Sequence, residues 1–368
     1  MISPHSKLSP RRRVAGRGPR RPGEVLWQPL ALAGAIVALS VARRRLGLPR
    51  KPMVPVASTV PLAVALAVPR GRVQYAAMWV AYVWLFKTAW EIPYDKPDKL
   101  RARLHVRYPI RADTLLGGGV PPGVRLQRRL RDRSRANGLD IALTATAYVL
   151  WLVPHAVIAW MLLCDERRFP RAAGRLSAVY HVTTLGYWAV PTAPPWWASE
   201  QEGELDGAIQ HVTRDVAIAV KHRLVGGPEP CVQERLRSDR EGGNPWGTMP
   251  SDAFPAAVVT AKTLAEISPR AGACGWSMAL LHGGALVYLG EHYVTDLLGG
   301  WLIVELLWRL EPRALPLVRL AVAALRTLET RARRAATGPT RAPWIGGGSL
   351  PTAAPAGLAR VWWRSRGR

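Results

Sequence analysis

Cysteine is scarce in this chain of 368 residues, which contains only Cys164, Cys231 and Cys274. These three residues lie far apart and fit neither a disulfide framework nor the paired spacing of a zinc site. The sequence also lacks a glycine-rich nucleotide loop, a Ser-His-Asp triad and the paired carboxylates that bind catalytic metal ions. We therefore expect no metal and no cofactor.

Acidic residues are also few. The chain has 25 Asp and Glu against 51 Lys and Arg, which gives a formal net charge of +26. A charge of this size suggests nucleic acid, anionic lipid or an anionic substrate as a partner. The basic residues mostly flank apolar runs and do not form one compact domain, so lipid headgroups explain the charge with fewer assumptions. We expect a lipid bilayer as partner and no nucleic acid.

Apolar and charged residues are segregated along the chain, because 49% of the residues are hydrophobic while the mean hydropathy is only +0.01. A helix needs about 20 mainly apolar residues to cross a bilayer. We therefore predict an all-α, polytopic membrane helical bundle with about 6–8 transmembrane helices, as a multi-pass protein of the cell membrane. The apolar runs lie at residues 27–42, 53–69, 73–90, 139–163, 175–192, 253–267, 273–290 and 296–310.

The domain organisation follows from these runs. Two long polar connections, 91–138 and 193–250, interrupt the core. Two apolar runs separate them, and an even number of crossings places both connections on the same face of the membrane. Because 91–138 is itself strongly basic, the positive-inside rule leaves the membrane orientation open. We expect four regions, namely a basic disordered N-terminus at 1–26, N-terminal transmembrane helices at 27–72, a membrane catalytic core at 73–310, and an amphipathic helix with a disordered basic tail at 311–368.

The segment Val287-Tyr-Leu-Gly-Glu-His-Tyr-Val-Thr-Asp296 carries ionisable residues at the mouth of two apolar runs. His292 and Asp296 are four residues apart, so a helix that begins near His292 brings them onto one face. A carboxylate bonded to one imidazole nitrogen fixes the tautomer and makes the other nitrogen a better nucleophile or base. The competing interpretation is an interfacial helix start with solvated side chains. Spacing alone leaves both open.

A second segment, Gly243-Asn-Pro-Trp-Gly-Thr-Met-Pro-Ser-Asp-Ala-Phe254, leads directly into an apolar run. Ser251 or Asp252 would cap the following helix, whose free N–H groups are able to hold a phosphate. The alternative is a capped helix start without function. Straight spans bring this segment and His292 to the same face, together with the basic connection 91–138. From that connection we select Lys99, Arg107 and Arg111 as phosphate-binding candidates, beside Ser251 and Asp252.

These motifs carry a resemblance to a known family. The Gly-Asn-Pro-Trp and Met-Pro-Ser-x-x-Phe segment, followed by Tyr288-Leu-Gly-Glu-His-Tyr-x-x-Asp296, resembles the type 2 phosphatidic acid phosphatase (PAP2) superfamily. Val190-Pro-Thr-Ala-Pro-Pro195 and His105-Val-Arg-Tyr-Pro-Ile-Arg-Ala-Asp113 are similar to its inositolphosphotransferase-like membrane branch. The resemblance covers roughly residues 75–310, so the predicted core is PAP2-like.

The resemblance implies a metal-free helical bundle that works through a covalent phosphohistidine. His292 would attack phosphorus, Asp296 would orient and activate it, and Ser251 with nearby backbone N–H groups would hold phosphate oxygens. Two positions depart from the family pattern. Ala253 stands where a second histidine would protonate the leaving group, and Leu286 stands where many members carry an arginine. Loss of positioned proton transfer typically costs about 10²–10⁴-fold in rate.

Several functions remain open on the sequence. The first is a phosphatase or phosphotransferase acting on a lipid-linked phosphate or diphosphate, such as an isoprenoid diphosphate, phosphatidate or an inositol phospholipid. The second is a repurposed scaffold, either a membrane terpene synthase that cyclises a prenyl diphosphate or a non-catalytic lipid binder. A structural or transport protein is the third, but it leaves the convergence of the two motifs unexplained.

Overall fold

The computed structural model describes residues 26–43, 45–48, 52–133, 135–226 and 244–337. The expected disordered N-terminus and most of the expected tail lie outside these residues. Within the described residues the ordered elements are helical and no strand occurs, which confirms the all-α prediction. Isolated backbone bridges at His105, Thr192 and Gly247 are the nearest approach to a sheet there.

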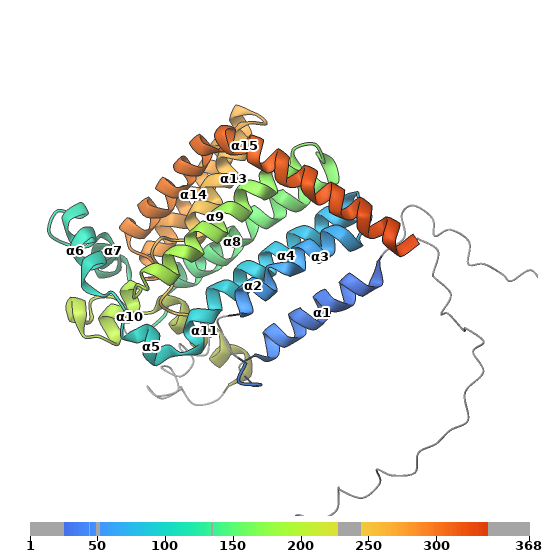
Figure 1. Cartoon of the computed structure of the whole chain (residues 1–368). Coiled ribbons are helices and arrows are strands. Elements are labelled where there is room, and N and C mark those ends of the chain that lie inside the picture. Colours follow the sequence, from blue (N-terminus) through green and yellow to red (C-terminus); the bar gives the residue numbers. More distant parts are fainter. Residues whose placement is uncertain (1–25, 44, 49–51, 134, 227–243, 338–368) are drawn as a thin grey trace, which may run out of the picture.

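The long helices run side by side and form a bundle (Figure 1). They are α1 (Trp27–Ala42), α2 (Met53–Ala57) continued by α3 (Thr59–Ala67), α4 (Arg72–Glu91), α8 (Gly138–Cys164), α9 (Phe169–Ala189), α13 (Ala253–Ala265), α14 (Pro269–Tyr288) and α15 (Val294–Thr337). Short elements gather at one end of the bundle (Figure 1). They are η1 (Ile92–Asp95), α5 (Pro97–Arg101), α6 (Arg107–Leu116), α7 (Pro122–Leu130), α10 (Pro195–Glu200), η2 (Glu204–Gly207) and α11 (Val212–Val225).

Helix α8 is the one described helix that is long and apolar enough to cross a membrane. It starts with a capping box, in which Asn137 accepts from the Asp140 N–H and the Asp140 carboxylate accepts from the Asn137 N–H. Only 22% of its apolar window is buried inside the protein. Shorter apolar helices cover 27–42, 53–67 and 253–265. The expectation of about 6–8 crossing helices remains a prediction for the others.

Helix α13 lies at the centre of the bundle because small residues let its neighbour come close. A Cβ added to Gly275 of α14 would lie 2.7 Å from the Ala261 Cα, and one added to Gly272 would lie 2.7 Å from the Ala265 Cβ. Phe254 and Val258 of α13 join a buried core cluster with side chains from the surrounding helices. The close α13–α14 contact therefore fixes where the two helices end, and with them the loops that they carry.

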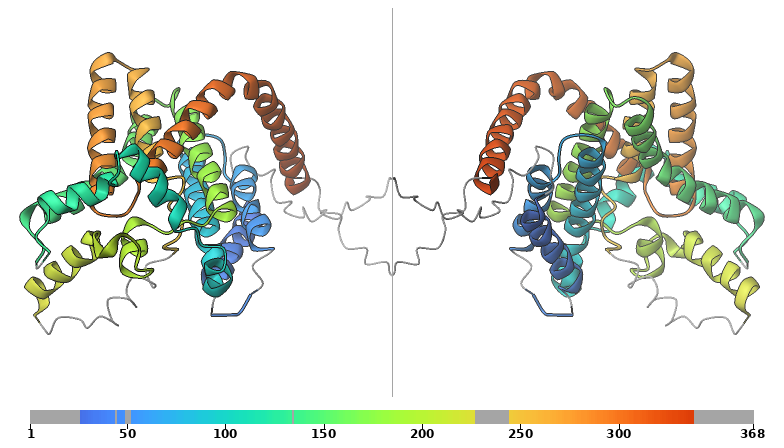
Figure 2. Two further views of the ribbon diagram at one scale, coloured as in Figure 1. Left: turned by 90° about the vertical axis from the view of Figure 1, so that its left-hand side faces the viewer. Right: turned by 90° about the vertical axis from the view of Figure 1, so that its right-hand side faces the viewer.

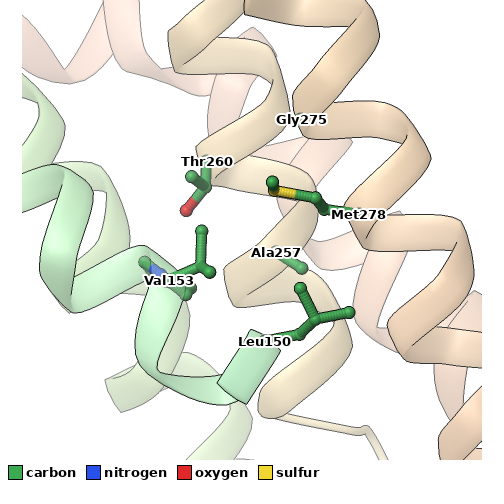
Figure 3. A pocket seen from close by; sticks show the side chains of 7 residues that line it. Leu150, Val153, Ala257, Thr260, Gly275 and Met278 are labelled. Atoms are coloured by element: carbon green, nitrogen blue, oxygen red, sulfur yellow. The ribbon is translucent and has the colours of Figure 1, made fainter. Parts of the chain in front are cut away.

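A small apolar cleft lies between α8, α13 and α14 (Figure 3). Leu150, Val153, Ala257 and Met278 line it, and its Thr260 hydroxyl donates to the Ala256 carbonyl at 2.8 Å. No charged side chain lines this cleft. The groups able to perform chemistry lie instead at the end of the bundle that carries the short helices.

The amphipathic helix predicted within 311–368 is not a separate element. It continues α15, which runs for 44 residues with Pro312 and Pro316 inside it. Proline removes a helical hydrogen bond and kinks a helix, and Figure 2 shows α15 bending over the bundle. An ion pair between Arg70 and Glu329 at 2.6 Å ties its far half to the turn before α4.

Within the connection 193–250 the sequence predicts an amphipathic helix near 205–224, but helix α11 starts later, at Val212. Leu205 and Asp206 have φ of 62° and 49°, which is left-handed backbone that an α-helix does not accept. A short 3₁₀ turn occupies Glu204–Gly207 instead. The later start leaves residues 208–211 free to pack against the loop that follows α14.

Candidate active site

Three loop segments that are distant in sequence are joined by backbone hydrogen bonds at the bundle end. The Thr192 N–H donates to the Trp246 carbonyl at 2.9 Å, the His105 N–H donates to the Pro191 carbonyl at 2.9 Å, and the Ala193 N–H donates to the His105 carbonyl at 3.0 Å. The Tyr108 and Thr192 hydroxyls are 2.9 Å apart. These contacts bring the three segments with family-like motifs into one layer beside α13.

Ser251, His292 and Asp296 form a buried polar line in this layer. Ser251 Oγ lies 3.3 Å from His292 Nε2, and His292 Nδ1 lies 3.4 Å from Asp296 Oδ2. Ser251 and Asp296 are 0% exposed, and His292 is 8% exposed. The line therefore joins the two sequence motifs as expected, and His292 retains the limited access that a reacting group needs.

The local fold around His292 differs from the expected helix start. Helix α14 ends at Tyr288, and Gly290 follows with φ 79°, a left-handed conformation that suits glycine at a helix end. Helix α15 begins at Val294, after His292. Asp296 Oδ2 accepts a hydrogen bond from the Tyr293 N–H at 2.9 Å, so this carboxylate also caps the first turn of α15. The contact expected from the spacing of four residues still forms, because the capping turn folds His292 back toward Asp296.

Ser251 connects the start of α13 to the start of α15. Its N–H donates to the Asp296 carbonyl at 3.1 Å, and its Oγ accepts from the Phe254 N–H at 3.3 Å. Ser251 is therefore the side chain that caps α13, although Asp252 occupies the formal cap position. Ser251 before α13 and Asp296 in the first turn of α15 both lie within hydrogen-bond distance of the His292 ring. The N-terminal ends of two helices are therefore close to His292, and such ends favour bound anions.

Asp113 of α6 is a site residue for which sequence reasoning assigned no role. Its carboxylate accepts from the Val294 N–H at 3.0 Å and from the Thr295 N–H at 2.9 Å, and the residue is 1% exposed. Asp113 thus satisfies two free N–H groups at the start of α15. Asp113 is the last residue of the His105–Asp113 motif, and its place in that motif was the only signal of its role in the sequence.

The electrostatics of the site favour a reactive imidazole. Burial lowers the pKa of His292, but the hydrogen bond and charge of Asp296, followed by the charges of Asp252 and Glu291, raise it above its usual value overall. With its Nδ1 proton directed at Asp296, a neutral His292 presents the lone pair of Nε2 beside Ser251. That arrangement suits nucleophilic attack on phosphorus.

The predicted basic ligands lie farther out. Arg107 is exposed and pairs with Glu204 at 2.8 Å, while Lys99 and Arg111 are exposed on α5 and α6. No hydrogen bond among the described residues joins these three to Ser251 or His292, so their role stays a prediction. Lys87 of α4 lies over the Trp90 ring at 3.9 Å and contributes charge at Asp252.

The two departures from the family pattern are both buried. Ala253 is 8% exposed in the first turn of α13, and Leu286 is 7% exposed on α14. Neither side chain is able to donate a proton or hold an anion. Among the described residues, no three His, Cys, Asp or Glu side chains are grouped closely enough to hold a metal ion.

Comparison with known proteins identifies the family of this chain. Residues 125–310 match a family model described as the PAP2 superfamily. That segment is just over half of the chain and contains Ser251, His292 and Asp296. No curated protein and no solved structure gives a significant match. The chain therefore belongs to the PAP2 superfamily, whose members carry out phosphatase-type chemistry on phosphate substrates.

Proposed function

We propose that this protein is a multi-pass membrane phosphatase or phosphotransferase that acts on a lipid-linked phosphate or diphosphate. The observation that carries the proposal is the buried line of Ser251, His292 and Asp296, with the His292 Nε2 directed away from its carboxylate partner. Membership of the superfamily supports phosphatase-type chemistry. The similarity of the 105–113 and 190–195 motifs to the inositolphosphotransferase-like branch supports a lipid substrate.

The exposed surface supports a membrane environment. Large apolar side chains on α8 are exposed, among them Tyr148, Leu152 and Leu163 at 61%, 54% and 65%. On α15, Leu302 and Leu306 are 70% and 54% exposed. Monomeric soluble proteins rarely expose contiguous apolar surface of this kind, and lipid tails would cover it. A substrate dissolved in the bilayer would then reach the end of the bundle without leaving the membrane.

The reaction proceeds through a covalent intermediate. Nε2 of His292 attacks phosphorus while Ser251 Oγ and the N–H groups at the start of α13 hold the phosphoryl oxygens. The Asp296 carboxylate keeps the Nδ1 proton in place and stabilises the positive charge that the imidazole gains. Water or an alcohol then takes the phosphoryl group from His292, which gives a phosphatase or a phosphotransferase.

The test uses purified protein with micelles that contain phosphatidate or farnesyl diphosphate, and it measures released phosphate. His292→Ala should abolish turnover, whereas His222→Ala on α11 is the matched control and should retain it. Denaturing gels of protein incubated with ³²P-labelled substrate should show an acid-labile phosphoprotein that His292→Ala lacks. Undiminished turnover by His292→Ala would exclude the phosphohistidine mechanism.

An aromatic column favours one second candidate, the cyclisation of a prenyl diphosphate. Phe86 and Tyr180 stack with ring centroids 4.5 Å apart, and His155 lies 5.9 Å from Tyr180 and 5.8 Å from Trp79. Aromatic faces stabilise carbocations. The products of farnesyl diphosphate separate the candidates, because a hydrocarbon supports cyclisation, whereas farnesol or farnesyl phosphate with released phosphate supports the hydrolase. Absence of any product would support a lipid binder.

A further inference from the structure

Position 253 holds an alanine, so the proposed phosphohistidine reaction needs a proton donor from another residue. An alkoxide is a poor leaving group, and a positioned acid contributes about 10²–10⁴-fold to its departure. The donor must lie beside the bound phosphoryl group and reach solvent, because the same residue has to recover its proton from the attacking water. These two requirements limit the candidates to ionisable side chains at the rim of the Ser251–His292 cluster.

Most ionisable groups around His292 already have a structural task. Both oxygens of Asp113 accept backbone N–H groups of α15, and Asp296 Oδ2 holds His292 and the Tyr293 N–H. The Glu291 carboxylate accepts from the Thr213 hydroxyl at 2.6 Å and lies 3.3 Å from His211 Nε2.

The remaining histidine near the site is also unsuitable. His282 lies within α14 and is 1% exposed. Neither the leaving group nor water reaches it without opening the bundle. Asp252 differs from all of these groups, because it is only half-buried and directly follows Ser251.

We infer that Asp252 is the general acid and base of this site, a role that rests on the proposed phosphohistidine reaction. Asp252 directly follows Ser251, whose Oγ lies 3.3 Å from His292 Nε2. The charge of Asp252 acts on His292, on the hydroxyls of Tyr180 and Tyr187 of α9, and is itself influenced by Lys87 of α4. A phosphate held by Ser251 and the start of α13 would therefore lie close to both His292 and Asp252.

The environment of Asp252 keeps it protonated more readily than an ordinary aspartate. Burial raises the pKa of this carboxyl, while the charges of His292 and then Lys87 oppose the rise. A phosphate dianion bound beside it would favour the protonated form further, because like charges disfavour ionisation. The acid is thus available at the moment when the negatively charged substrate is in place.

The proton and electron movements balance over two steps. In the first step the Nε2 lone pair forms the N–P bond, the P–O bond to the lipid breaks, and the Asp252 carboxyl gives its proton to the departing oxygen. In the second step the Asp252 carboxylate takes a proton from water as the water oxygen bonds to phosphorus. The N–P bond then breaks, its electron pair returns to Nε2, and free phosphate leaves with Asp252 protonated again.

Leaving-group dependence tests this assignment. Asp252→Asn should lower kcat for phosphatidate, whose leaving group is an alkoxide, by about 10²–10⁴-fold. Formation of the phosphoenzyme from p-nitrophenyl phosphate, measured as a burst of nitrophenolate, should remain close to that of the unaltered protein. This leaving group departs without a proton, so the burst also reports that the variant is folded. An equal loss on both substrates, or no loss on phosphatidate, would overturn the assignment.

Two further variants keep the test decisive. Asp252→Glu retains an acid and should keep more phosphatidate turnover than Asp252→Asn. Adding Ala253→His to Asp252→Asn supplies a donor one residue along and should restore part of the lost phosphatidate turnover, whereas a residue with a purely structural role would not be replaced in this way. His292→Ala separates the two hypotheses: if it retains the burst, the phosphohistidine proposal fails, irrespective of Asp252.

Discussion

Replacing Asp296 with asparagine isolates the charge of the carboxylate from its geometry. Asp296 Oδ2 accepts from both the Tyr293 N–H and His292 Nδ1, while Oδ1 has no partner among the described residues. The amide oxygen of Asp296→Asn is therefore able to occupy the Oδ2 position and preserve both hydrogen bonds. The amide NH₂ then takes the Oδ1 position, and the His292 tautomer is retained.

The expected effect is consequently a loss of charge stabilisation alone. A full unit charge on the imidazole, 3.4 Å from the carboxylate, would be worth about 5 kcal/mol at an effective dielectric constant of about 20. The imidazole gains only part of a charge in the transition state, so we expect kcat to fall by about 10²–10³-fold. Nitrophenolate release from p-nitrophenyl phosphate measures this fall, and the exposed Asp98→Asn is the control.

The pH dependence of the rate provides a second, independent test of the pairing of His292 with Asp296. Burial lowers the pKa of His292, and the bond to Asp296 is the strongest of the effects that raise it. Attack requires neutral His292, so the rate rises as the pH passes upward through that pKa. Removing the Asp296 charge lowers the pKa, and the rising limb of Asp296→Asn should move to lower pH. An unmoved limb, a limb displaced to higher pH, or an undiminished kcat would refute the assigned pairing.

Two other substitutions test the scaffold of the site. Asp113→Ala leaves the Val294 and Thr295 N–H groups without their acceptor, and we expect thermal unfolding to show a loss of about 1–3 kcal/mol with a lower kcat. A smaller loss in Asp113→Asn, which keeps one acceptor, is the comparison, and equal stability of Asp113→Ala and the unaltered protein would contradict the capping role. Arg131→Met removes a 2%-exposed guanidinium that lies 3.4 Å from Asp140 and 2.6 Å from Asp215, which should destabilise the protein by about 3–5 kcal/mol. Arg135→Met, at an 83%-exposed side chain, should have little effect in the same denaturation assay.

The histidine–carboxylate pair was predictable because its geometry is local. Residues four apart at a helix start meet whether His292 lies in the first turn or just before it, and the structure chooses the latter. The convergence of Ser251 with His292 was predictable from the order of the apolar runs. Two adjacent antiparallel helices necessarily return the chain to the same end of a bundle.

The roles of charged residues in the connections were not predictable in the same way. Arg107 was selected for its basic character, but its side chain pairs with Glu204. Asp113, six positions after Arg107 on the same helix, holds the start of α15 through contacts with residues more than 180 positions away. Sequence patterns report periodicity and local spacing, whereas the partner of a loop side chain depends on how distant segments pack.

The sequence by itself determined the helical class, the apolar runs and the pairing of His292 with Asp296, because these depend on composition and short-range spacing. Only the tertiary structure decided that Asp296 both caps α15 and holds His292, that Asp113 supports the same turn, and that α15 continues past Pro312 and Pro316. It also left Asp252 half-buried at the start of α13, beside Ala253. Each of these features depends on the close contact of α13 with α14 and on the loops joined at the bundle end. Such long-range packing produces no periodic pattern in the sequence.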